Sequence, residues 1–345
     1  MRVYPKASRG LAPSACYNDF AMPKIYLSNR FKPAIAAGVL WSGALLISGC
    51  GLTPSELKKI RPPSLPQPKV PVLKAGALPT ITVIPGGSES YWNEARRGSE
   101  AAGKKFGARI VWKVPSGDLI PSQKKLVENV SKTSHGLVLA PTDSTKLMQP
   151  VGDAARAGVA VVTFDRDIFT NQNKLSFVHN DDEASGVLAA KQVGNSTAGS
   201  GSAVAMQSHS KPDAEVRRNS FEQSLKTSFP KVELFQPGNF AGANPIAFEP
   251  GGIPAREILS SVQFTPPTGT KPFHIVFGAD EVLRQAVQRG EILALISPDY
   301  YQMAFQSVKA IMDFRATKQM PPREIKIAPR VLTKNSATTT IGSTP

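Results

Sequence analysis

The sequence predicts an α/β protein whose parallel sheets are flanked by helices. From about residue 79, short apolar runs alternate with longer segments that have helical period. The runs are apolar at every position, which is typical of strands buried on both faces. Strand and helix follow one another as in βαβ units, in which the strands of a sheet run parallel.

The predicted elements follow in chain order. The strands are ITVIP (81–85), ARIVWKV (108–114), GLVLAP (136–141), VAVVTFD (159–165), SFVHN (176–180), SAVAMQS (202–208), VELFQP (232–237), HIVFGA (274–279) and LALISP (293–298). Segments such as EARRGSEAAGKKFG and STKLMQPVGDAARAG lie between them. In the second segment Leu147, Val151 and Ala154 share one helix face, and Gly158 marks the carboxyl end.

The length of 345 residues predicts about two domains, and the charge does not predict a nucleic-acid-binding protein. Residues 1–50 carry six basic side chains and one acid, a surplus of +5 out of the net +15. The other basic residues are scattered, without a dense run or interleaved aromatics, so no nucleic-acid partner is predicted.

The amino-terminal segment has the layout of a secretory signal. Lys24, Arg30 and Lys32 precede an uncharged run, PAIAAGVLWSGALLISG, which is shorter than a spanning helix requires. The run ends in ISG followed by Cys50, which is typical of a bacterial lipobox and predicts lipidation of this thiol. Met22 is an alternative start. An uncleaved membrane anchor or a buried helix is the alternative to a cleaved leader.

Cysteine content agrees with export as a lipoprotein. Only Cys16 and Cys50 are present, and Cys16 would leave with the leader, so no disulfide is predicted. The proline-rich segment after Cys50 predicts a semi-rigid tether of about thirty residues. We therefore expect an exported protein, held at the bacterial cell envelope by a lipid.

The residues directly after each strand are the candidates for a ligand site, because ligands bind at the carboxyl ends of parallel strands. Asp143 and Ser144 follow one strand, and a local role at the start of the next helix, with Asp143 as its N-cap, explains both equally well. Asp165 and Arg166 follow the next strand. An adjacent acid and base can accept and donate hydrogen bonds to vicinal hydroxyls. A structural salt bridge is the alternative for this pair.

Four segments resemble the type I periplasmic sugar-binding family, which contains ribose-binding protein and is related to lac-repressor-type core domains. The segments are GLVLAPTDST, AGVAVVTFDRD, SFVHNDDEASGVLAAKQV and SPDYYQMAFQSVKAI. The resemblance covers residues 79–335 and is strong through residue 226. It implies a two-lobed fold in which each lobe is a parallel sheet flanked by helices. It also implies a sugar or similar polyhydroxylated ligand, and an ABC importer or a sensor as partner.

The resemblance also implies particular site residues. Tyr91 and Trp92 match the aromatic residues that lie against a sugar ring, and Asp165 and Arg166 match the pair that binds sugar hydroxyls. The arginine that the family has at the start of a second-lobe helix, four residues before a phenylalanine, matches Arg217 in EVRRNSF. Asp280 matches a later aspartate, although its register is off by about two residues.

The second lobe departs from the family pattern. Only one strand–helix unit, HIVFGADEVLRQAVQRG, is recognised between IPAREILSS and LALISP, so this lobe is predicted to be one βα unit short. The hinge glutamine of the family falls on Pro298, or is replaced by Ser297 or Asp299. A lipoprotein that keeps the fold without binding sugar, and acts as an interaction protein of the envelope, is therefore the alternative function.

The predicted organisation and chemistry follow from these observations. The segments are a signal peptide (1–49), a tether (50–78), a first lobe (79–180 plus 299–322), a second lobe (181–298 plus 323–335) and a tail (336–345). No phosphate loop, dinucleotide fingerprint, nucleophile elbow or metal-ligand spacing is present. We therefore expect no enzyme activity, no cofactor and no metal.

Overall fold

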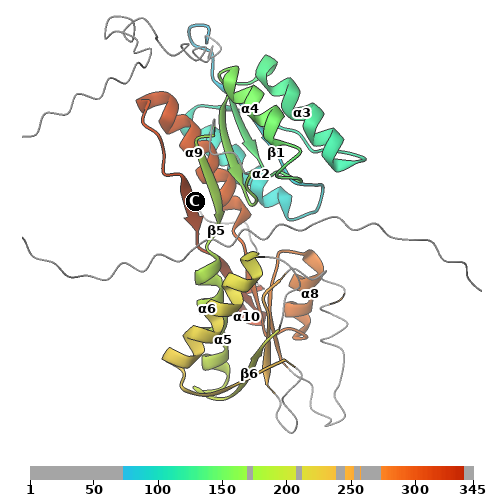
Figure 1. Cartoon of the computed structure of the whole chain (residues 1–345), viewed down its shortest axis with the longest axis vertical. Coiled ribbons are helices and arrows are strands. Elements are labelled where there is room, and N and C mark those ends of the chain that lie inside the picture. Colours follow the sequence, from blue (N-terminus) through green and yellow to red (C-terminus); the bar gives the residue numbers. More distant parts are fainter. Residues whose placement is uncertain are drawn as a thin grey trace, which may run out of the picture. The chain divides into compact units, whose positions relative to one another are not determined.

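The structure is a computed structural model that describes residues 73–168, 174–206, 212–237, 245–251, 257 and 273–337. Two sheets and their covering helices make up this part of the chain (Figure 1). The strands are β1 (Thr80–Ile84), β2 (Arg109–Trp112), β3 (Gly136–Leu139), β4 (Ala160–Phe164), β5 (Ser176–Asn180), β6 (Ser200–Ala205), β7 (Lys231–Phe235), β8 (Ile246–Glu249), β9 (His274–Phe277), β10 (Ala294–Ser297), β11 (Glu324–Ile327) and β12 (Arg330–Thr333). The helices are α2 (Trp92–Phe106), α3 (Leu119–Thr133), α4 (Met148–Arg156), α5 (Asp182–Ser196), α6 (Pro212–Ser228), α8 (Glu281–Arg289), α9 (Tyr300–Thr317) and α10 (Lys334–Ala337).

The first sheet has the order β11-β5-β4-β3-β1-β2, and every neighbouring pair is parallel. Alternate residues of each strand enter different cores. Val83 packs with α2 and α9 on one face, and Ile84 packs with α3 and α4 on the other. The helices α3 and α4 lie side by side on that second face (Figure 1). Burial on both faces explains why these strands are continuous apolar runs.

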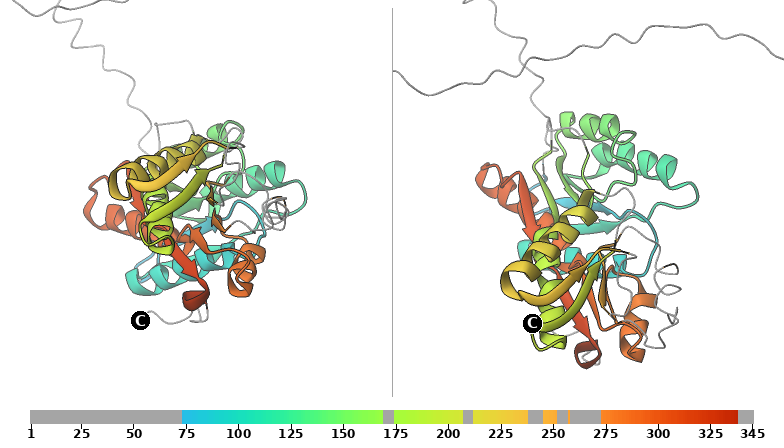
Figure 2. Two further views of the ribbon diagram at one scale, coloured as in Figure 1. Left: turned by 90° about the horizontal axis from the view of Figure 1, so that it is seen from below. Right: turned by 60° about the horizontal axis from the view of Figure 1, so that its bottom comes forward.

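The second sheet has the order β12-β10-β9-β8-β6-β7, and only β12 is antiparallel to its neighbour among the described pairs. Phe248 and Ile275 pack against α5 and α6, whereas Val276 and Leu295 pack against α8. The helices α5 and α6 lie side by side in every view (Figures 1 and 2). The predicted α/β class, with helices flanking parallel sheets, is confirmed.

The second sheet has as many strands as the first, so the prediction that this lobe lacks a βα unit needs correction. The sequence IAFE forms the central strand β8, which was not among the predicted strands because four residues are a short signal. The strand that seemed to be missing after the segment IPAREILSS is therefore present before that segment, as β8. The part of this lobe that is short is the connection between Phe235 of β7 and Ile246 of β8. It has fewer residues than the dozen or more of a usual crossover connection between parallel strands.

The chain passes between the two sheets after β5, after β10 and after β11. The carboxyl-terminal residues divide at the last crossing: β11 pairs with β5 in the first sheet, and β12 pairs with β10 in the second. We predicted 323–335 as part of the second lobe alone. The parallel register of Glu324–Ile327 with Phe177–Asn180 places the first half of that segment in the first sheet.

Glycine allows close approach of the helix pairs. A Cβ on Gly98 of α2 would lie 2.1 Å from the carbonyl oxygen of Tyr301 in α9. A Cβ on Gly186 of α5 would lie 2.2 Å from the carbonyl oxygen of Arg217 in α6. In both pairs the obstacle is backbone, so these glycines set the distance between helices that carry candidate site residues.

All residues of the four apolar clusters lie between Ile81 and Leu332. The chain from residue 51 onward therefore contains the complete core of the described part. The lipobox with Cys50, the leader and the tether up to residue 72 lie outside the described residues. Among the helices that the structure describes, none has the length and apolar character needed to span a bilayer.

Candidate functional site

The carboxyl end of β4 carries the first candidate, Asp165, in an unusual backbone conformation. Its φ is +64°, in the left-handed region that non-glycine residues rarely adopt and that Asp tolerates better than most. The amide of Asp165 donates to the carbonyl of Val178 at 3.0 Å, and the amide of Arg166 donates to the carbonyl of Phe164 at 2.7 Å. This sharp turn separates the side chains of Asp165 and Arg166.

The carboxylate of Asp165 faces an aromatic cluster at the start of α2 and α9. The hydroxyl of Tyr300 donates to Asp165 Oδ1 at 3.0 Å. The ring of Tyr300 stacks on Tyr91 with centroids 5.0 Å apart, and Trp92 lies edge-on to Tyr300 at 5.0 Å. Trp92 is 5% exposed and donates its indole N–H to Glu89 at 3.0 Å. Tyr91 is the half-buried ring of this cluster.

Burial has the largest effect on the pKa values of this cluster. It raises the pKa of the Asp165 carboxyl, although Arg166 and the Tyr300 hydroxyl act in the opposite direction. Burial and the neighbouring charge of Asp165 raise the pKa of Tyr300 well above the ordinary range of tyrosine. Burial and the charges of Glu89, Asp165 and Asp280 raise the pKa of Tyr91. Both phenols are therefore protonated and can act as hydrogen-bond donors.

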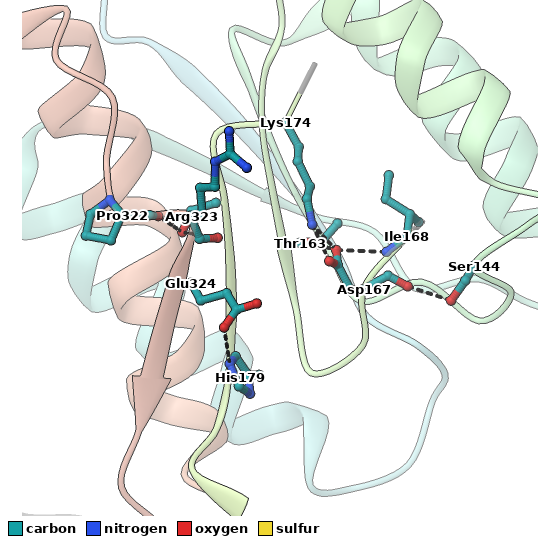
Figure 3. Close-up of polar contacts among 10 residues, drawn as sticks. Ser144, Thr163, Asp167, Ile168, Lys174, His179, Pro322, Arg323 and Glu324 are labelled. Carbon is teal, nitrogen blue, oxygen red and sulfur yellow. Dashed lines mark hydrogen bonds and ion pairs between the residues drawn. The ribbon is translucent and has the colours of Figure 1, made fainter. Parts of the chain in front are cut away.

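The loop after Asp165 is fixed by Asp167, as Figure 3 shows. The Asp167 carboxylate accepts hydrogen bonds from the hydroxyl of Thr163 and the amide of Ile168, both at 2.8 Å, and pairs with Lys174. The hydroxyl of Ser144 donates to the carbonyl of Asp167 at 2.5 Å. Ser144 therefore supports the loop, in a role that the sequence did not predict.

Asp143 has a local role in the turn before α4, although the N-cap residue of that helix is Leu147 and not Asp143 as the alternative predicted. Its Oδ1 accepts from the amides of Thr145 and Lys146 at 2.9 and 2.8 Å, ahead of α4. These backbone donors lower the pKa of its carboxyl. A carboxylate engaged in this way fixes a turn.

The second lobe contributes Arg217 of α6, which is 5% exposed. Its Nε donates to the carbonyl of Pro250 at 2.6 Å, its Nη1 pairs with Asp182, and its guanidinium carbon lies 3.8 Å from the ring centroid of Phe277. Its Nη2 has no hydrogen-bond partner among the described residues. Gly251 adjoins this nitrogen, because a Cβ there would come within 3.4 Å of it.

Asp182 connects Arg217 to the chain crossing after β5. The side-chain amide of Asn180 donates to Asp182 Oδ1 at 2.7 Å and to Ser185 Oγ at 2.8 Å. Burial raises the pKa of Asp182, opposed by the charge of Arg217. The charge of Asp182 in turn raises the pKa of Asp165, so the Asp165 cluster and the Arg217 cluster lie within electrostatic reach of each other.

The structure thus brings together most of the predicted site residues. Tyr91, Trp92 and Asp165 form one cluster, and Arg217 lies in the adjoining one. Arg166 is mostly exposed and approaches Asp165 only at 4.0 Å. Asp280 is exposed at the N-cap position of α8 without a capping side-chain bond, and its charge reaches Tyr91.

Sequence reasoning missed four residues of this region: Tyr300, Asp182, Phe277 and Glu94. Tyr300 and Asp182 come within three residues of a strand end, which is the signal that could have identified them. Glu94 is 9% exposed in α2, and its carboxylate lies 3.2 Å from Arg284 of α8 and also pairs with Arg330 of β12. Arg330 also reaches Asp299 at 3.0 Å. Only the tertiary structure shows this ion-pair network, whose members are far apart in sequence.

The site has the chemistry of recognition by hydrogen bonds and aromatic faces. It offers a buried carboxylate acceptor, an arginine N–H donor and phenol hydroxyls beside apolar rings. Among the residues that the structure describes, no group of three His, Cys, Asp or Glu side chains is placed to hold a metal ion. The arrangement suits a small neutral molecule rich in hydroxyl groups.

The folded part is similar to known proteins in sequence. Residues 81–247 match the family described as periplasmic binding protein domain. The D-allose-binding periplasmic protein of Escherichia coli is 27% identical over 164 residues, which cover 44% of this chain and 53% of that protein. The chain therefore spans about half the length of the curated relative that it matches.

Solved structures share the whole fold. An arabinose-binding protein from Geobacillus stearothermophilus has a TM-score of 0.65 at 15% identity, covering 76% of this chain and 99% of its own. A periplasmic solute-binding protein of an ABC transporter from Actinobacillus succinogenes, solved with bound D-allose, has a TM-score of 0.59 at 17% identity, covering 76% and 100%. The predicted two-lobed type I fold is confirmed.

Proposed function

We propose, from the premise that residues 81–247 carry a periplasmic binding protein domain, that the chain is an extracytoplasmic solute-binding lipoprotein. It binds a sugar or a similar polyhydroxylated molecule and presents it to an ABC importer or to a sensor. Its activity is binding without catalysis. The ligand contacts both lobes and favours the closed arrangement, as in hinge closure around small ligands.

The observation that carries this proposal is that two clusters within electrostatic reach of each other contain an acid, Asp165, and a base, Arg217, which each keep a polar atom for a ligand. Asp165 keeps an Oδ2 oxygen that accepts no hydrogen bond from a described residue, and Arg217 keeps its Nη2. Vicinal hydroxyls donate to a carboxylate and accept from a guanidinium, so these two groups match a sugar. Tyr91 supplies a half-buried ring for the apolar face of the ligand.

The names of similar proteins support the ligand class. D-allose and arabinose are named for the proteins that resemble this chain. Pentoses and hexoses are therefore the first ligands to test. Tyr91, Trp92, Asp165, Arg166, Arg217 and Asp280 are the proposed contacts. Trp92 is packed within the aromatic cluster and the Arg166 side chain is mostly in solvent, so both side chains would have to move to reach a ligand.

The lipid anchor is a separate part of the proposal, supported by sequence alone. The apolar run, the small residues and Cys50 have the order that a lipoprotein signal requires. The proline-rich segment that follows would hold the folded part away from the membrane. Failure of the anchor would leave the sugar site unaffected, because none of its residues precedes Tyr91.

A thermal-shift screen of the chain from residue 51 against pentoses, hexoses and nucleosides tests the binding function. A ligand that binds the folded state raises the melting temperature, because it adds about 2.7 kcal/mol of stability at a hundredfold excess over Kd. We expect at least one sugar to do so. A folded protein that responds to no sugar would refute the transport function and favour the alternative of an envelope interaction protein.

Variants then locate the site. Asp165→Ala and Arg217→Ala are each expected to weaken the ligand found in the screen by more than about tenfold, the loss that follows when one charged hydrogen bond is removed. Asp153→Ala is the matched control, because Asp153 is an exposed acid of α4 whose ion-pair partner among the described residues is the neighbouring Arg156. Unchanged affinity in both site variants would show that the ligand binds elsewhere.

A further inference from the structure

Basic side chains gather at the amino edge of the first sheet, where Glu324 at the start of β11 is an exposed acid. The strands of this sheet all run parallel, so their first residues lie at one edge, and the helices that cover them end there. We call this surface the basic face. Its members are Lys74, Lys104, Lys105, Arg109, Lys132, Arg315 and Lys318.

Two members of the basic face, Lys74 and Arg109, line one groove. Leu78 and His135 also line it. The charge of Arg315 lowers the pKa of His135, together with burial, which has the larger effect. Arg315 therefore lies near the same groove, although it belongs to the end of α9.

The cations of the basic face lack carboxylate partners among the described residues, although Lys105 lies over the rings of Phe106 and Phe305. None of the seven forms an ion pair with a residue that the structure describes, and all except Arg315 are exposed. In the second lobe, by contrast, Arg217 of α6, Arg284 of α8 and Arg330 of β12 each have a carboxylate partner. The basic face therefore differs from that region because its cations have no neighbouring carboxylate to neutralise them among the described residues.

Helix dipoles account for only part of this pattern. Cations in the last turn of a helix are favourable, which explains Lys104, Lys105, Lys132 and Arg315. The same reasoning does not explain Lys74 before β1 or Arg109 at the start of β2. It also does not explain two exposed apolar side chains on this edge, Leu78 at 57% and Met320 at 63% exposure.

The course of the chain points to what this face meets. Leu73 is the first described residue and lines the groove, so the segment that leads back to Cys50 starts from the basic face. Cys50 and Leu73 lie 23 positions apart in the sequence. Extended chain spans at most roughly 3.5 Å per residue, so this length permits the face to lie on the surface that holds Cys50.

We infer that the basic face binds the anionic headgroups of a phospholipid bilayer, with Leu78 and Met320 as apolar contacts at the lipid interface. Lysine and arginine near an anionic bilayer each contribute about a fivefold gain in binding, and salt screens that gain. This contact orients the folded part with the amino edge of the first sheet against the membrane. It does not depend on sugar binding or on acylation of Cys50.

The test uses the chain from residue 51, which contains the complete core and lacks the leader and Cys50. Its sedimentation is measured with vesicles of phosphatidylcholine alone, and with vesicles that contain equal amounts of phosphatidylcholine and phosphatidylglycerol. We expect binding to the anionic vesicles only, and loss of that binding as salt is raised. Equal binding to both compositions, or to neither, would overturn the inference.

A pair of double variants locates the contact. Lys104→Glu/Arg109→Glu changes the last turn of α2 and the first residue of β2, and is expected to weaken vesicle binding by at least about tenfold. Lys226→Glu/Lys231→Glu changes the last turn of α6 and the first residue of β7, with the same change in net charge. This control is expected to bind nearly as well as the parent chain.

The remaining outcomes are equally decisive. Equal loss in both double variants would mean that net charge, not the basic face, drives binding. Tighter binding of a DNA duplex than of the anionic vesicles would reassign the face to nucleic acid. Melting temperatures and the sugar response of each variant show that the fold and the sugar site are intact, so failure here is distinguishable from failure of the proposed function.

Discussion

The hydroxyl of Tyr300 donates a hydrogen bond to Asp165 Oδ1 at 3.0 Å, across 135 positions of sequence. This bond joins the start of α9, where the chain re-enters the first lobe, to the end of β4. The carboxylate of Asp165, a residue with left-handed backbone, is therefore oriented by a tyrosine that also stacks on Tyr91. The candidate acceptor for a ligand and a chain crossing between the lobes form one unit.

The first prediction concerns Asp165→Asn in the absence of ligand. Burial raises the pKa of this carboxyl, so the folded state disfavours the charged form. The resulting loss of stability is absent below the ordinary aspartate pKa of about 4 and grows as pH rises from there to the folded-state pKa. We expect Asp165→Asn to melt above the parent protein at neutral pH, by a margin that shrinks toward pH ~4.

The same substitution has a second expected effect. Asn tolerates the left-handed backbone and keeps an acceptor for Tyr300, but lacks the charge that strengthens hydrogen bonds to hydroxyls. The variant should therefore be more stable and bind ligand more weakly. A lower melting temperature at neutral pH would show instead that the folded state favours the charged form of Asp165.

The second prediction concerns the buried pair of Arg217 and Asp182. Arg217→Met leaves the Asp182 carboxylate buried without its cation, which costs about 3–5 kcal/mol in comparable pairs. Urea unfolding measures this loss. The double variant Arg217→Met/Asp182→Asn should recover part of it, since the uncompensated charge is gone.

A neighbouring arginine provides the control for that experiment. Arg218 lies one residue further along α6 and pairs with Glu222 at 2.9 Å, in a more exposed position. Arg218→Met is expected to cost only about 0–1 kcal/mol. Equal losses at the two positions would mean that burial of the Arg217 pair has no energetic consequence.

The third prediction concerns the contact between α5 and α6. Gly186→Ala places a methyl group 2.2 Å from the Arg217 carbonyl oxygen and 2.7 Å from the Phe221 amide. Backbone cannot move aside as a side chain does, so we expect a cost of about 1–3 kcal/mol. The displaced Arg217 should also weaken ligand binding.

Gly152→Ala in α4 is the matched substitution in a helix. The nearest atom there is Arg156 Nη1 at 3.3 Å, the end of an exposed and flexible side chain. Removing a helical glycine at such a position should add about 0.5–1 kcal/mol. Opposite signs for the two variants in chemical denaturation would support the close helix contact, and similar signs would argue against it.

The fourth prediction concerns Cys50, which lies outside the described residues. Cys50→Ser removes the thiol required for acylation, so the protein should leave the detergent-soluble membrane fraction of the cell envelope once a high-salt wash has screened the contacts of the basic face. Immunoblotting of the cell fractions measures how much of the parent and of the variant protein is in the membrane fraction. Continued retention of the variant after washing with high salt would indicate an uncleaved apolar helix instead of a lipid.

The fold class could be predicted because it is encoded locally. Buried parallel strands are short apolar runs, and the helices between them have a helical period, so each element is visible in a window of a few residues. The central strand β8 was missed because IAFE is short and is followed by Pro250. Its place in the sheet depends on pairing with β6 and β9, which are distant in sequence.

Some residues of the candidate site could be predicted for the same reason. Asp165 follows a strong strand signal, and Arg217 lies in a segment that resembles a known family. Arg166 shows the limit of sequence adjacency, since the positive φ of Asp165 directs the neighbouring side chain into solvent. The partners Tyr300 and Asp182 were not found, because a hydrogen bond between distant segments leaves no local pattern.

The sequence by itself determined the α/β class, the candidate acid Asp165, the lipoprotein signal that remains a prediction, and the absence of known catalytic motifs. Each of these depends on residue type and spacing within one segment. Only the tertiary structure decided that Tyr300 holds Asp165 and that Arg217 is paired with Asp182. It also decided that cations from α2, α3, α9, β2 and the segment before β1, without carboxylate partners among the described residues, share one edge of the first sheet. These are relationships between segments, and they are set by parallel strand order and by the close packing of helices, which no single segment encodes.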